Sequence, residues 1–441
     1  MMHEPTVLVT PPILLSPRPL ARCPGAFSLV PLLPLPPPRK RLPLDVWSGI
    51  LAHVFRSYQA GYAHRGSCSA QDLKLGLLLV CKDWKAIASP LFYAHVCIAT
   101  LSSLEKLAWC LRSAEQKWDS IRRIPYSTPG RWIRTLDLSS MPVKSPADAY
   151  YADALLTVIF PLLPFMVRCD MTPLLSLSCR AMASLTYRDG AVNLRSLKSI
   201  KKSFISPSDE DPLIELLRNS VNLEEIEIVG SGLEMVEVWL EHAQEHDLAI
   251  HQPLRLSRLR KLVLLSMPCS SLMYLLLRSP LPSLRHLTIT PYDDVIIPAS
   301  LVRRFIEVHG SSLTSLHLFT LNSWPTAMFP SPNTILHTCP NLYHLSLEKP
   351  LPAVLPTKSP HPLKILSIPR PDAQFLPVLE ALLPSLPDLK LIHARDVRWL
   401  RGGVSPRART AGVQGEMVAW RRRLARRGIE LVDADWQPWS E

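Results

Sequence analysis

The chain has 441 residues, of which 47% are apolar and 20% charged, so most of it can bury a core and disorder of the whole chain is excluded. Fifteen glycines against 44 prolines argue against a nucleotide-binding fold, whose phosphate loops need glycine. The sequence contains no run of about 18 apolar residues, so no membrane-spanning helix is predicted. The length fits two or three units or one elongated repeat array.

The nine cysteines are odd in number and are never spaced as C-x-x-C, which predicts free thiols rather than a disulfide framework or a zinc site. Residues 26–35 are apolar, but Pro31 and Pro34 interrupt them and no small-residue cleavage site follows, so we expect no secretory signal. These features predict a cytoplasmic or nuclear protein, or one present in both compartments.

The net charge of +12 is concentrated in two segments. Residues 1–41 carry +4 and residues 395–427 carry +8, whereas residues 42–394 carry only +4. Because the long central part is close to balanced, we expect no nucleic-acid partner and no membrane partner for it.

Residues 1–40 contain eleven prolines and show no apolar periodicity. Proline fixes φ and removes a hydrogen-bond donor, so this segment is predicted to be a disordered leader. A proline-rich ligand for an aromatic groove is the alternative.

A short helix is predicted next. Pro43 suits a first helical turn and Asp45 favours the helix dipole. Val46, Ile50 and Val54 recur at intervals of four, which predicts an amphipathic helix with a wide apolar face.

Residues 57–71 are polar and are predicted to form a loop. A second helix is then predicted to run from Leu75 through Trp84 and Ile87 and to end at Pro90.

Two strings in this region, residues 41–99, resemble the F-box. They are Leu42-Pro43-Leu44-Asp45-Val46-Trp47 followed by Ile50-Leu51, and Leu79-Val80-Cys81-Lys82-Asp83-Trp84 followed by Ile87 and Pro90-Leu91. The segment that continues to His95-Val96 is also similar to the F-box-like domains of mushroom-forming fungi. A generic helical hairpin is the alternative.

The resemblance implies that the helices dock on the Skp-family adaptor of an SCF-type ubiquitin ligase, and through it on a cullin. The residues that match the family's adaptor-binding positions are Leu42, Pro43, Val46, Ile50, Leu51, Val80, Cys81 and Trp84.

After a predicted linking helix and loop at residues 100–130, the template L-x-x-L-x-L recurs. Successive copies begin 21 to 36 residues apart, as in leucine-rich repeats. The copies begin at Ile133, Met166, Leu194, Leu223, Leu259, Leu284, Leu313, Leu342, Leu363 and Leu386; those at Met166 and Leu194 are degenerate, and the last reads Leu386-x-x-Leu389-x-Leu391.

In such a repeat the leucines of one strand face the same side and need the next repeat to cover them. Helical stretches are predicted to return behind the strands, at residues 213–218, 233–246, 272–277, 301–308 and 375–383. The predicted fold is therefore α/β: a short helical F-box-like domain followed, over residues 131–435, by a leucine-rich-repeat-like solenoid with a parallel sheet on its concave face and helices behind. Unrelated βα units in a doubly wound domain are the alternative.

The sequence contains no phosphate-binding loop and no G-x-S-x-G motif. His242-Ala243-Gln244-Glu245-His246 matches the H-x-x-E-H zinc-protease signature, but it falls on a predicted back helix with no fixed third ligand. We expect no metal, no cofactor and no enzymatic activity.

Near the C-terminus, a basic capping helix is predicted at residues 415–427, followed by a last strand at 429–432. Trp436 and Trp439 are expected to cover the final edge of the sheet. A nuclear-import or acidic-partner patch is the other interpretation of the arginine cluster, which comprises Arg421, Arg422, Arg423, Arg426 and Arg427.

The resemblance implies a substrate-recognition adaptor in ubiquitin-dependent protein degradation, in which the repeat array binds a target protein. A protein-binding scaffold with a vestigial F-box is the alternative. The target is not predicted, but the positions between the leucines are expected to face it; they include Arg285, His286, Thr288, His317, His344 and Lys364.

Overall fold

The computed structural model describes residues 42–60, 69–116, 128–201, 211–230, 252–267, 270–291, 301–321, 331–400 and 412–438. The predicted leader, the predicted helix 233–246 with its His242 and His246, and Trp439 lie outside the described residues.

Three helices form the first unit: α1 (Leu44–Ala60), α2 (Ser69–Leu78) and α3 (Lys82–Tyr93). Helix α1 begins where the carbonyl of Pro43 accepts the amides of Val46 and Trp47, at 3.1 and 3.2 Å. The helices enclose a small core of Leu51, Phe55 and Ala88. This core is separate from the larger core of the rest of the chain.

The helix boundaries differ from the predicted ones. The predicted loop 57–71 is too long, because α1 extends to Ala60 and α2 begins at Ser69. The predicted second helix is in fact two helices, since the chain turns at residues 79–80 and the Sγ of Cys81 accepts the amide of Trp84 at 3.4 Å, which caps α3. Pro90 lies inside α3 rather than at its end. The hydrogen bond that proline removes would have reached the carbonyl of Ala86, which belongs to an exposed residue and is open to solvent.

In the rest of the described chain the strands form one 12-stranded sheet in the order β1 to β12, and each strand pairs in parallel with the next one in sequence. The strands are β1 (His95–Cys97), β2 (Thr135–Asp137), β3 (Arg168–Asp170), β4 (Ser196–Lys201), β5 (Glu225–Val229), β6 (Lys261–Leu265), β7 (His286–Ile289), β8 (Ser315–Leu318), β9 (His344–Ser346), β10 (Ile365–Ile368), β11 (Leu391–Ala394) and β12 (Glu430–Val432).

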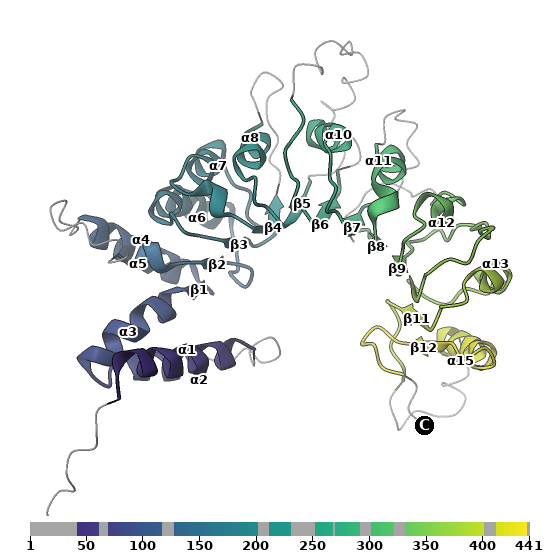
Figure 1. Ribbon diagram of the computed structural model, residues 1–441, viewed down its shortest axis with the longest axis horizontal. Coiled ribbons are helices and arrows are strands. Elements are labelled where there is room, and N and C mark those ends of the chain that lie inside the picture. The colour runs from purple at the N-terminus through teal and green to yellow at the C-terminus, as the bar shows by residue number, and fades with distance from the viewer. Residues whose placement is uncertain are drawn as a thin grey trace, which may run out of the picture.

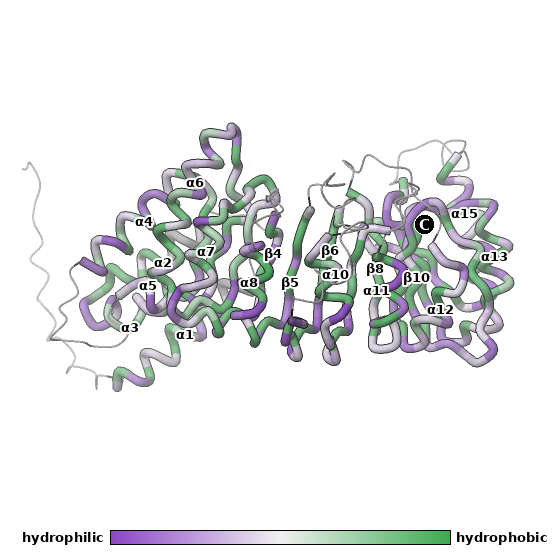
Figure 2. The backbone as a smooth tube through the Cα atoms, turned by 90° about the horizontal axis from the view of Figure 1, so that it is seen from above, coloured by the Kyte–Doolittle hydropathy of each residue, from purple (hydrophilic) through white to green (hydrophobic). Residues whose placement is uncertain are grey.

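Helices follow the strands and lie on the outer side of an arch whose inner side the strands line (Figure 1). Seen from above, the repeats lie side by side along the long axis (Figure 2). The helices are α4 (Leu101–Gln116), α5 (Pro129–Trp132), α6 (Pro146–Ile159), α7 (Cys179–Thr186), α8 (Pro212–Asn219), α10 (Ser271–Arg278), α11 (Val302–His309), α12 (Ile335–Thr338), α13 (Phe375–Leu382) and α15 (Gly412–Ala425), with short 3-10 turns η2 (Phe160–Leu162), η3 (Ala191–Asn193), η5 (Gly310–Ser312) and η6 (Leu383–Ser385).

The leucine template forms the core of this array. In β7, Leu287 is 1% exposed and its strand partners are Leu262 in β6 and Leu316 in β8. One continuous apolar cluster runs from Ile98 to Leu431. The structure confirms the predicted α/β class with a parallel sheet and a leucine-rich-repeat-like stacking of repeats.

The sheet begins earlier than residue 131. Strand β1 pairs with β2, and Leu104 and Leu111 of α4 are buried in the main core. Residues 95–116 therefore supply the first strand and the first returning helix, because the chain leaves α3 directly into the sheet.

The last predicted template copy is out of register by three residues. Ile392 pairs with Leu366 of β10, and the buried row of this repeat is Leu389, Ile392 and Ala394. Leu391 is only half-buried. The prediction of Leu386-x-x-Leu389-x-Leu391 is wrong, because an extra buried leucine at 386 completes a chance match.

The C-terminal helix α15 buries Met417, Trp420 and Leu424 against the last repeat. Pro438 bridges back to Val432 of β12. Trp436 does not cover the sheet edge as expected but stacks on His393 of β11, with ring centroids 4.0 Å apart. Among the described residues, none of the helices has the length and apolar character to span a bilayer.

Candidate functional site

The concave face of the sheet carries two rows of side chains. Side chains alternate along a strand, so the residues on either side of each buried leucine face the inside of the arch. In β7 these are His286 and Thr288, which flank Leu287. The strand register places the equivalent residues of neighbouring repeats beside them.

Over β3 to β5 these rows hold ion pairs. Arg168 donates from its Nε to Asp170 at 2.8 Å, and the Nζ of Lys198 lies 3.1 Å from Glu225. Burial alone would raise the pKa of Glu225, but the hydrogen bond and charge of Lys198, helped by Lys261 and Arg168, lower the pKa. The carboxylates of Asp170 and Glu225 are therefore paired with bases of the same face.

Over β8 to β11 the rows hold a hydrogen-bonded line of histidines and serine. The Nε2 of His317 lies 3.1 Å from the Nδ1 of His344, and the Nε2 of His344 lies 2.8 Å from the Oγ of Ser367. The same Oγ lies 3.1 Å from the Nδ1 of His393. A neutral imidazole has one donor and one acceptor, so neutral rings satisfy this line.

Burial, and after it the charge of Arg395, lower the pKa of His317 to about 4. The pKa of His344 is also lowered to about 4, first by burial and then by His317. Both rings are therefore neutral at neutral pH, and the line presents hydrogen-bonding groups rather than charge.

Arg395 follows β11 and holds one edge of this region together. Its guanidinium donates to the carbonyls of Leu318 and Leu347 at 3.2 and 3.0 Å and pairs with Glu348 at 3.0 Å. Trp436 lies against His393. Together they border a hollow of about 230 Å³ that the histidine line also borders.

A larger groove of about 1160 Å³ opens beside this hollow, over β5 to β9. Five of the six positions expected to face a target line it, and the sixth, Lys364, lies at its rim with its Nζ 5.0 Å from the ring centroid of Tyr343. The five are Arg285, His286, Thr288, His317 and His344.

Sequence reasoning missed Ser367, His393, Arg395 and Trp436. Aligning the β11 repeat three residues later would have placed His393 in the same row as His317. No sequence signal places Trp436 on the concave face, because this contact joins segments that local patterns do not relate.

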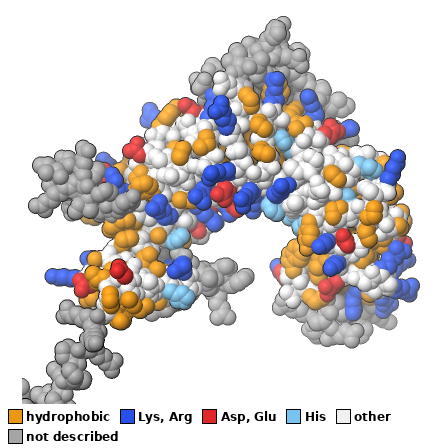
Figure 3. Space-filling view, in the orientation of Figure 1, with side chains coloured by type: hydrophobic (Ala, Val, Ile, Leu, Met, Phe, Trp, Pro, Cys, Tyr) orange, Lys and Arg blue, Asp and Glu red, His pale blue; other side chains and the backbone are white. Residues whose placement is uncertain are grey.

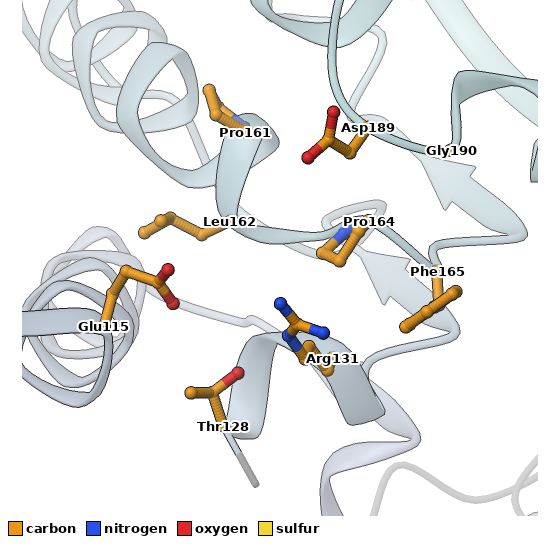
Figure 4. Close-up of a pocket in the computed structure, with 9 residues that line it drawn as sticks. All are labelled: Glu115, Thr128, Arg131, Pro161, Leu162, Pro164, Phe165, Asp189 and Gly190. Carbon is orange, nitrogen blue, oxygen red and sulfur yellow. The ribbon is translucent and has the colours of Figure 1, made fainter. Parts of the chain in front are cut away.

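A second hollow, of about 300 Å³, lies on the side of the N-terminal repeats. Figure 4 shows Arg131 and Asp189 pointing into it. Among the described residues no three His, Cys, Asp or Glu side chains gather as a metal site.

The residues that match the F-box lie mainly on the surface of the α1–α3 unit. Leu42, Val46, Ile50 and Val80 are 41 to 59% exposed. Pro43 and Cys81 are also exposed, and Trp84 is half-buried with its ring 4.8 Å from that of Trp47. Leu51 differs, because it is 1% exposed and belongs to the core of the unit. It therefore supports the helices and offers no surface to a partner.

We expect the free energy of unfolding to fall as the pH falls from about 6.5 to about 4. His317 and His344 bind protons in the unfolded chain near pH 6.5 but in the folded chain only near pH 4, so acid favours unfolding. Partial exposure reduces the effect to about 1–2 kcal/mol per ring, and the two hydrogen-bonded rings titrate together.

Urea unfolding near pH 7 and near pH 5 checks this expectation. The double change His317→Gln, His344→Gln should reduce the pH dependence, and the matched control is His53→Gln at an exposed position of α1. An equal loss of stability at acid pH in the double variant would contradict the assignment.

No protein-family model and no curated protein matches this sequence. Solved structures that resemble it include a chain of the Toll–Spatzle complex of Drosophila, 11% identical, covering 64% of this chain and 29% of that one, with a TM-score of 0.29. They also include a chain of the Rad7 and Elc1 complex of yeast. It is 14% identical, the match covers 82% of this chain and 92% of that one, and the TM-score is 0.30. The chain thus spans under a third of the Toll-complex chain, and TM-scores this low assign it neither a family nor a partner.

Proposed function

We propose that this chain is the substrate-recognition subunit of an SCF-type ubiquitin ligase, in which α1–α3 dock the Skp-family adaptor, and through it a cullin, and the concave face binds a target protein. The F-box-like strings at residues 42–51 and 79–91 motivate the proposal. Such a subunit acts in the cytoplasm or the nucleus.

The observation that carries the proposal is the exposed apolar face of the α1–α3 unit. Leu42, Leu44, Val46 and Ile50 are 41 to 59% exposed along the start of α1, and Leu79 and Val80, in the turn before α3, are 83 and 59% exposed. Apolar side chains gathered on a small helical unit favour burial against a partner. These residues lie within the two F-box-like strings.

The junction between the helical unit and the solenoid suits an adaptor. Helix α3 leads directly into β1, and the Tyr93 ring at its end lies 6.1 Å from that of Trp132 in α5. The hydroxyl of Tyr93 also contacts the Sγ of Cys110 in α4 at 3.9 Å. A ligase core docked on α1–α3 would therefore be held in a defined orientation to a target on the concave face.

We also propose that the chain has no catalytic activity of its own. Ser367 is the described hydroxyl most closely placed between histidines, but it is 1% exposed and hydrogen-bonded to both neighbouring rings. The line contains no carboxylate that would orient a histidine as a base.

Capture of a purified Skp-family adaptor by the tagged full-length chain tests the proposal. The double change Val46→Asp, Ile50→Asp places two charges in the docking face without touching the buried core, and it should weaken capture about thirtyfold or more. The matched control is Val308→Asp, which changes an apolar residue of the outer helix α11 that is more exposed than Val46 or Ile50.

Capture that is undiminished in the double variant would remove the ligase role and leave a protein-binding scaffold. Loss of capture together with a lowered unfolding midpoint would point to misfolding. For this reason the midpoints of both variants are measured alongside.

A further inference from the structure

We propose that the groove over β5 to β9 binds an extended acidic segment of the target protein. The proposal rests on the proposed function and specifies the chemistry of its target. The lining residues on which the argument depends are Arg260, Lys261, Arg285, His286, His317 and His344.

The first argument is the charge of the groove. Arg260, Lys261 and Arg285 line it, and within the described part of the chain none of them forms an ion pair. Among its described lining residues the one acid is Glu225, which is paired with Lys198 and also interacts with Lys261. The three cations therefore outnumber the acid that faces them, and Figure 3 shows basic side chains, with acidic ones among them, on the inner side of the arch beside histidines.

His286 interacts with both charges of the groove. Burial lowers its pKa, the charge of Lys261 lowers it further, and Glu225 opposes this by raising it. The uncharged His317 and His344 border the far side of the groove, where His344 uses both ring nitrogens within the histidine line and the Nδ1 of His317 lies outside it. Carboxylates thus find cations on one side, and a peptide backbone finds the neutral His317 on the other.

The second argument is geometric. Neighbouring strands lie about 4.8 Å apart, so β6 to β9 span about 14 Å. An extended peptide rises about 3.4 Å per residue, so four or five residues cross these strands. Alternate side chains, about 7 Å apart, reach Lys261 of β6 and Arg285, which lies just before β7, and then the groups of β8 and β9.

The acids beside the groove disfavour a nucleic acid as the occupant. Asp170, Glu225 and Glu227 lie on the concave strands β3 and β5, next to the basic residues. A phosphate backbone would need a longer continuous basic track. A short acidic peptide segment needs only the cations of β6 and β7.

Selection of random peptides displayed on phage, with the immobilised full-length chain as bait, tests the proposal. Asp and Glu should be enriched among the selected peptides. The leading peptide, labelled with a fluorophore, should bind in solution, and its affinity should fall as salt rises. The double change Lys261→Gln, Arg285→Gln should weaken it about tenfold or more, whereas Arg304→Gln on the outer helix α11 should not.

A selection without acidic enrichment, or equal affinity for the double variant, would overturn the proposal. Tighter binding of a labelled RNA oligonucleotide, lost in the same variant, would do so as well. Adaptor capture is measured on the same proteins. If the adaptor is captured but no acidic peptide binds, only this inference is removed. If an acidic peptide binds but the adaptor is not captured, only the ligase role is removed.

Discussion

Replacing Leu287 by Asp is expected to unfold the central repeats and not only its own strand. Leu287 is 1% exposed, at the centre of β7, and its backbone pairs with Leu262 on one side and Leu316 on the other. A carboxylate there has no partner and costs several kcal/mol, a large part of the total stability of a domain. Because each repeat is stabilised by the repeats beside it, the loss spreads to β6 and β8.

Urea unfolding followed by circular dichroism, with limited proteolysis, measures the effect. The matched control is His286→Asp, which introduces the same charge one residue earlier on the exposed concave face. It should change the free energy of unfolding by about 0.5 kcal/mol or less. An unfolding midpoint like the wild type for Leu287→Asp would show that β7 is not part of a continuous core.

The fold could be predicted from the sequence wherever one residue spacing determined one strand. The rows at Leu259, Leu284 and Leu313 each lie where the structure has β6, β7 and β8, because two leucines on one face of a short strand require a covering repeat. The weak copy at Met166 also became β3, since Cys169 and Met171 are buried in the same manner.

The leucine template gave the wrong register where leucines are too frequent, and it gave no strand where they are absent. Near Leu386 an additional buried leucine completed a false match, and only the pairing of Ile392 with Leu366 reveals the true register. At β1 the inward residues are Val96 and Ile98, which do not match the leucine template. For this reason the strand is assigned to the end of the F-box-like segment in the sequence. Composition alone does not distinguish these cases.

The candidate site was predictable only in part, for a related reason. His317 and His344 stand at positions that the template assigns to the concave face, so their exposure to the groove followed from alternation. Because the predicted copy at Leu386 is three residues out of register, it does not assign His393 to the concave face. The contacts of Trp436 with His393 and of Arg395 with Leu318 join distant segments, and only the curvature of the finished array brings them together.

Replacing Trp420 by Ala is expected to destabilise the C-terminal end of the array and to spare its beginning. Trp420 is the largest of the fully buried described side chains and lies in α15 between Met417 and Leu424. Removing a buried tryptophan costs about 3–5 kcal/mol. In a solenoid this loss is borne by the nearest repeats, here β11 and β12, because distant repeats share no interface with α15.

Hydrogen exchange resolved by peptide distinguishes this outcome from global unfolding. Amides of β11 and β12 should lose protection, while those of β2 to β5 should keep it. Arg422→Ala, on the exposed side of the same helix, is the control and should leave both ends unchanged. Equal loss of protection from β2 to β12 would mean that the array unfolds as a single cooperative unit. In that case α15 would stabilise every repeat. Trp420→Ala and Leu287→Asp would then expose the same strands, instead of the C-terminal and the central strands respectively.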